Sequence, residues 1–159
     1  MGLQLDSVRN VMVHYGPRTT TGKFGREVPT EGLLNQAVYV FSYDDLPANG
    51  ATNLQLSIPA YAKIKSASFE VLTAFAGGTS YTVGLNKADG TVVDADGIAT
   101  AVNLALANIN ARGASVNCTG AMVNVGSVGA DPVEVVVTAS GTFTAGKARL
   151  VIEWEREGN

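Results

Sequence analysis

The sequence predicts a mainly β protein: an antiparallel, jelly-roll-like β-sandwich with one short helix and an extended N-terminal arm. Three observations favour this class. Apolar and polar residues alternate in about eight short segments, turn-forming residues separate these segments, and the chain has no regular succession of strands and helices. The 159 residues are enough for one domain, which we place at 37–159 after an arm at 1–36.

The first 36 residues show little apolar periodicity and are rich in glycine and proline. They hold four basic and three acidic residues, a net charge of +1, whereas the remainder holds seven basic and eleven acidic residues, a net charge of −4. This difference indicates that the arm faces an acidic surface. One alternative stays open, because Val11, Val13 and Tyr15 alternate: the arm could fold back as a first strand of the same domain.

Period-two alternation becomes plain from Ala37 onward, and it predicts strands that end at recognisable breaks. The first carries aromatic residues on one face and ends at 44–47, and later breaks are expected at Pro59, Gly77-Gly78 and the hairpin turn Asp89-Gly90. The remaining strands are expected at 54–58, 64–75, 81–85, 91–93, 116–118, 122–123, 133–137 and 148–154.

The apolar period changes between Ile98 and Asn110. Ile98, Val102, Ala105 and Ile109 fall on one helical face, Asp96 stands where a cap could be, and Gly113 follows. The segment therefore predicts the one short helix.

Composition excludes several classes of function. Charged residues make up only 16% of the chain, against roughly 25% in an average soluble protein, which suits a surface packed against neighbours. The weak net charge of −3 argues against nucleic-acid binding.

Cys118 is the sole cysteine, so an intrachain disulfide is impossible and we expect a buried thiol. We expect a soluble, unprocessed protein, without a membrane span or signal peptide.

The residues that could carry chemistry are few, and we predict no catalytic, metal or cofactor site. His14 is the only histidine and lies in the arm, where a scaffolded catalytic base is not expected. Asp94 and Asp96 lack the further ligands of a calcium loop and are better explained as turn residues. The acidic series at 153, 155 and 157 would line a solvated strand face rather than a glycosidase cleft.

Several longer phrases of the sequence are similar to those of capsid cement, or decoration, proteins of tailed bacteriophages. They are GPRTTTGKFG at 16–25, TEG at 30–32, YDDLP at 43–47, IPAYAKI at 58–64, the run 90–97, and AGKARLVIEW at 145–154. The resemblance spans most of the chain.

This resemblance implies a non-enzymatic protein of the virion that sits on the capsid exterior after synthesis in the host cytoplasm. Its partners would be the major capsid protein, which it bridges to stabilise the shell, and itself, as a homotrimer. Since aromatic and arginine side chains dominate interface energy, we expect shell contacts from Tyr15, Arg18, Phe24 and Arg26.

Two other classes of function remain as alternatives. A carbohydrate- or receptor-binding head or tail fibre module would present Trp154 with Tyr39, Phe41 and Tyr43 as an aromatic sugar platform. A hydrolase would have to use His14.

Overall fold

The structure is a computed structural model, and it describes residues 2–6, 11–15 and 34–156. The chain divides into two compact units, Met1–Leu33 and Leu34–Asn159. The first unit holds an antiparallel pair, β1 (Gly2–Asp6) and β2 (Val11–Tyr15), in which Gly2 lies opposite Tyr15 and Asp6 opposite Val11. Part of the segment expected to be an extended arm is thus paired, and the alternation at 11–15 marks a real strand.

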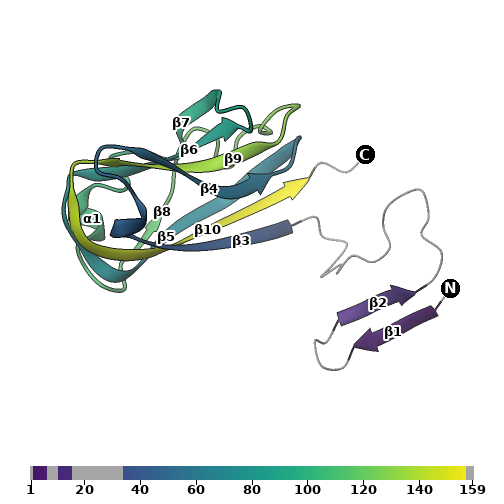
Figure 1. The fold of residues 1–159 in the computed structure, drawn as a ribbon. Coiled ribbons are helices and arrows are strands. Elements are labelled where there is room, and N and C mark those ends of the chain that lie inside the picture. Colours follow the sequence, from purple (N-terminus) through teal and green to yellow (C-terminus); the bar gives the residue numbers. More distant parts are fainter. Residues whose placement is uncertain (1, 7–10, 16–33, 157–159) are drawn as a thin grey trace. The chain divides into compact units, whose positions relative to one another are not determined.

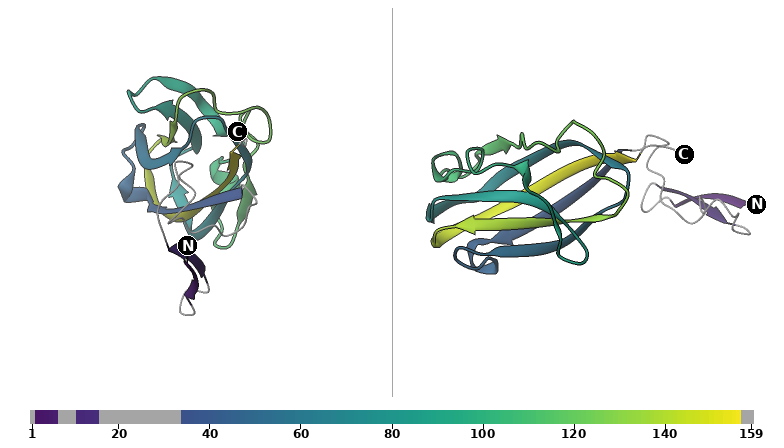
Figure 2. Two further views of the ribbon diagram at one scale, coloured as in Figure 1. Left: turned by 90° about the vertical axis from the view of Figure 1, so that its right-hand side faces the viewer. Right: turned by 90° about the horizontal axis from the view of Figure 1, so that it is seen from above.

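The second unit is an antiparallel β-sandwich of eight strands (Figures 1 and 2), as the alternation predicted. One sheet has the order β3 (Leu34–Ser42), β10 (Phe143–Arg156), β5 (Ala62–Gly77) and β8 (Ser115–Asn117). The other has the order β4 (Ala51–Ile58), β9 (Val133–Ser140), β6 (Ser80–Lys87) and β7 (Val92–Ala99).

The strand pairing follows one long folded ribbon. β3 pairs with β10, β4 with β9, β5 with β8, and β6 with β7, so each strand of the first half returns beside its counterpart in the second half. Successive pairs alternate between the two sheets. Pairing of β10 with β5 and of β9 with β6 then joins these ribbons within each sheet.

The core lies between the two sheets and is centred on aromatic rings. Phe41, Phe69, Phe75, Tyr81 and Phe143 are all buried. Tyr81 stacks on Phe143 with ring centroids 4.2 Å apart, and the other three rings contact Tyr81 from 5.3 to 6.4 Å. Each ring comes from an inward position of its strand. The period-two pattern placed Phe41, Phe69, Phe75 and Tyr81 in predicted strands, whereas Phe143 lies before the last strand predicted at 148–154.

The predicted helix is shorter than its pattern indicated. Only α1 (Leu106–Ile109) is helical, while Ile98 ends up buried in β7. The Asn103 side chain explains the difference, because its Oδ1 accepts hydrogen bonds from the backbone N–H groups of Thr100 and Thr119. Such side-chain bonds hold a turn in place of a helix.

Two further details differ from the sequence prediction. Asp94 and Asp96 lie within β7 and not in a turn, and the Asp94 carboxylate accepts the Asp96 N–H at a register shift of that strand. The strand expected at 122–123 is a single parallel bridge between Val123 and Ile64. The Asp89-Gly90 turn is confirmed, with Gly90 at a φ of +86° and Thr91 N–H donating to Asp89.

Candidate interaction surfaces

Of the four residues expected to bind a partner, the structure describes only the backbone of Tyr15. Tyr15 is the last residue of β2 and lies opposite Gly2. Arg18, Phe24 and Arg26 lie outside the described residues. Their contribution to a partner surface therefore stays a prediction.

The aromatic residues considered for a sugar platform do not form one on the surface. Trp154 is only 9% exposed and Phe41 is fully buried between the sheets. Tyr39 packs partly buried against the same core. Aromatic rings that bind sugars must be accessible, so this arrangement serves packing.

Possible sites of chemistry are equally sparse. In the described parts of the chain, no three His, Cys, Asp or Glu side chains are grouped as metal ligands, and no helix is long and apolar enough to cross a membrane. Cys118 is buried, as predicted, and burial raises the pKa of its thiol to about 12. A thiol that stays protonated is a poor nucleophile.

The outer face of the sheet β3-β10-β5-β8 is the surface that we consider a candidate for binding. Its middle strand, β10, alternates outward Lys147, Arg149, Val151, Glu153 and Glu155 with inward apolar residues. The inward side chains fill the core, so the outward side chains are the ones available to contact a partner.

Polar side chains on this face form a cross-strand network. Arg149 on β10 donates to the Glu70 carboxylate on β5 through Nε at 2.7 Å. Glu153 accepts hydrogen bonds from Gln36 at 3.2 Å and from the Ser66 hydroxyl at 2.7 Å. The network fixes the charged groups between β10 and β5, as expected for the solvated face predicted for Glu153 and Glu155.

The margin of the same face is aliphatic instead. Leu34, Val38 and Val40 on β3 are 50%, 52% and 47% exposed, and Val151 on β10 lies directly beside Val38. Sequence reasoning missed these residues, because it followed the aromatic side of the strand and placed 34–36 in the arm. The signal was present in the run AVYVF at 37–41, which is apolar on both faces.

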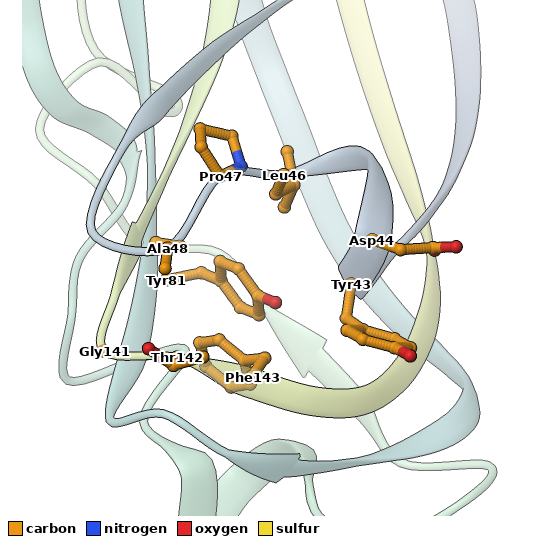
Figure 3. A pocket seen from close by; sticks show the side chains of 10 residues that line it. Tyr43, Asp44, Leu46, Pro47, Ala48, Tyr81, Gly141, Thr142 and Phe143 are labelled. Carbon is orange, nitrogen blue, oxygen red and sulfur yellow. The ribbon is translucent and has the colours of Figure 1, made fainter.

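A small pocket opens at the end of the sandwich beside the 3-10 turn η1 (Tyr43–Asp45) (Figure 3). Its volume is about 180 Å³, and Tyr43, Leu46, Pro47, Tyr81 and Phe143 contribute to its lining. The Tyr81 hydroxyl is buried there and has no hydrogen-bond partner among the described residues. The Asp44 carboxylate points away from this hydroxyl and does not bond to it.

Comparison with known proteins shows a shared fold. No protein-family model and no curated protein sequence matches the chain. A chain from the capsid of Ralstonia phage GP4 is similar in structure, with a TM-score of 0.57 and 16% identity over 79% of this chain and 86% of that one. A chain from the capsid asymmetric unit of cyanophage Pam1 has a TM-score of 0.54 and 13% identity over 89% of this chain and 100% of its own length.

Proposed function

We propose that this chain is a structural, non-enzymatic component of a tailed-bacteriophage head. It acts there as a cement, or decoration, protein that binds the shell exterior and bridges neighbouring major capsid proteins. The observation that carries the proposal is the fold shared with chains from two phage capsids over most of this chain. The sequence phrases similar to those of cement proteins support the same assignment.

The topology of the sandwich supports this role, and we propose that it is a jelly roll. Eight strands form two four-stranded sheets, and each strand of the first half pairs with its counterpart in the second half. Wrapping one antiparallel ribbon into two sheets is the plan of jelly rolls, which are common in viral capsid domains.

Cementing requires contact area and many copies rather than a reaction. Each copy adds a modest interface, and many copies bridging the same shell raise the barrier to its rupture through multivalency. The low charge content of 16% fits such a surface, since charged residues are depleted at the centres of protein interfaces.

The N-terminal segment is the element that we propose reaches the shell. Four basic residues among 1–36 give it a charge opposite to that of the sandwich. Tyr15, Arg18, Phe24 and Arg26 supply the aromatic and arginine contacts, because these residue types contribute most when they are desolvated at an interface.

Binding to undecorated heads of the parent phage tests the proposal. The full chain should co-sediment with the heads at a saturable ratio and raise the temperature at which they rupture. Removing residues 1–30 should abolish co-sedimentation, and replacing Arg18 and Arg26 by alanine should weaken it. Intact binding without residues 1–30 would reject the role of the arm, and no binding by the full chain would reject cementing itself.

The resemblance also implies a homotrimer. Its test is the solution mass of the full chain, which would be three times 16.4 kDa. The exposed edge strand β3 favours a different, two-fold association between copies.

A further inference from the structure

Each sheet of the sandwich has two edge strands, and three of the four edges are unsuited to pairing with another strand. β8 has only three residues. β4 is interrupted between Asn53 and Ser57, where Gln55 adopts a φ of +55°. β7 has two register shifts, and its edge is covered by Gly120 N–H and Met122 N–H, which donate to Ile98 and Gly97 carbonyls. Short length, bulges and covering loops are the usual protections of sheet edges.

Among the described residues, β3 has none of these protections. Its nine residues pair with β10 in one unbroken register, from Leu34 opposite Glu155 to Ser42 opposite Lys147. Its sequence, LNQAVYVFS, holds no charge and no proline. In the part of the chain that the structure describes, no further strand pairs with it, and β3 forms the margin of its sheet (Figure 1). A long, regular and apolar edge of this kind is a template for strand addition.

We propose that β3 pairs with β3 of a second copy of this chain, antiparallel and centred on Val38. In this register all nine residues find partners, with Val38 opposite the second copy's Val38 and Val40 opposite its Gln36. Val38, Val40 and Val151 of each copy then join into one cluster of six valines. The exposed aliphatic margin of one copy is covered by the same margin of the other, as a two-fold interface requires.

The charges on β10 are compatible with the same arrangement. Arg149 lies beside Val40, and Glu153 lies beside Gln36. The antiparallel pair therefore places Arg149 of one copy in the same cross-sheet row as Glu153 of the other, about 14 Å apart as three strand spacings. The row through Leu34 and Ser42 likewise joins Glu155 to the second copy's Lys147. Across β10 and β3, no row joins like charges, whereas parallel pairing of β3 strands in register would align Arg149 with Arg149.

A cross-linking experiment tests the register in the full chain. Val38→Cys places two thiols opposite each other within disulfide reach, so mild oxidation should yield a covalent dimer. Val92→Cys is the matched control, because Val92 is a similarly exposed valine, 59% against 52%, on the protected edge β7. Buried Cys118 should leave the wild-type chain uncoupled. Cross-linking of Val38→Cys no faster than that of Val92→Cys would overturn the proposal.

A charge-swap experiment tests the pair without a covalent bond. Sedimentation should give twice the chain mass for the wild type, and monomers for Val38→Lys and Val38→Glu, since each variant sets like charges opposite each other. An equimolar mixture of the two variants should restore the dimer, which shows that neither is misfolded. A wild-type monomer, or a trimer that Val38→Lys leaves unchanged, would overturn the β3 pair. Neither result bears on binding to phage heads.

Discussion

At the scale of single residues, the Tyr81 hydroxyl is the feature of the core that works against stability. Its ring is stacked between the sheets on Phe143, yet its oxygen is buried without a hydrogen-bond partner in the described region. Burial also raises the pKa of this hydroxyl. An unsatisfied buried hydroxyl costs on the order of 1–3 kcal/mol, so the ring stabilises the sandwich and its polar atom opposes it.

Tyr81→Phe should therefore raise the free energy of unfolding by about 1 kcal/mol, because it removes the unsatisfied group and keeps the ring. Urea denaturation followed by tryptophan fluorescence measures the change. Tyr43→Phe is the control, since Tyr43 lines the same pocket but is only partly buried, and it should leave stability unchanged. A loss of stability in Tyr81→Phe would show that the hydroxyl has a partner.

The Cys118 thiol gives a pH dependence with a definite sign. Burial raises its pKa in the folded chain from 9.0 to about 12. Between these values the unfolded chain releases the thiol proton and the folded chain keeps it, so stability falls as pH rises. This contribution is fully present below pH 9.0 and is lost toward pH 12. Above pH 9, Cys118→Ala should flatten the decline in unfolding free energy by up to about 1.4 kcal/mol per pH unit, and equal slopes would contradict this.

At the scale of elements, the sequence predicted strand ends correctly where a single local effect determines them. Pro59 and Gly77-Gly78 end strands as expected, because proline lacks a backbone donor and these glycines adopt φ values of +72° and +63°. The prediction of a helix over 98–110 was wrong for most of that segment. Its apolar residues have helical spacing, but the side chain of Asn103 binds backbone N–H groups and stabilises a turn instead. The hydrogen bond from the Thr119 N–H to that side chain joins positions 16 residues apart, which local periodicity cannot reveal.

The bulged edge β7 depends on a glycine of the neighbouring strand. Gly84 on β6 is buried, and a Cβ atom there would lie 2.4 Å from the Asp94 and Ala95 carbonyl oxygens. Gly84→Ala should therefore lower the unfolding free energy by roughly 2 kcal/mol, because the new methyl group meets backbone carbonyl groups, which cannot move aside as a flexible side chain would. Gly126→Ala is the control, since it meets nothing within 4 Å. Equal thermal midpoints for the two variants would contradict the close approach.

At the scale of the whole molecule, the class of fold followed from the sequence but the pairing of its strands did not. Alternation assigned inward residues such as Phe41 and Leu150 correctly, because each strand has one buried face. The order of strands depends on contacts between distant segments, such as Leu34 with Glu155, which no local pattern encodes. The run AVYVF shows that both faces of this strand are apolar, but only the folded chain shows that Val38 and Val40 lie exposed at a sheet margin.

The organisation into two units predicts that the sandwich folds without the N-terminal segment. Both four-stranded sheets consist of strands within 34–156, and the strands described in the first unit, β1 and β2, form a separate pair. A fragment of residues 34–159 should therefore unfold in one cooperative transition, with a urea midpoint and slope close to those of the full chain. The tryptophan signal of Trp154, on β10 in the core, reports this transition in both proteins.

A large loss of stability in the fragment would mean that residues 1–33 contribute to the folding of the sandwich. An unchanged transition combined with lost binding to phage heads would instead assign the segment to attachment alone.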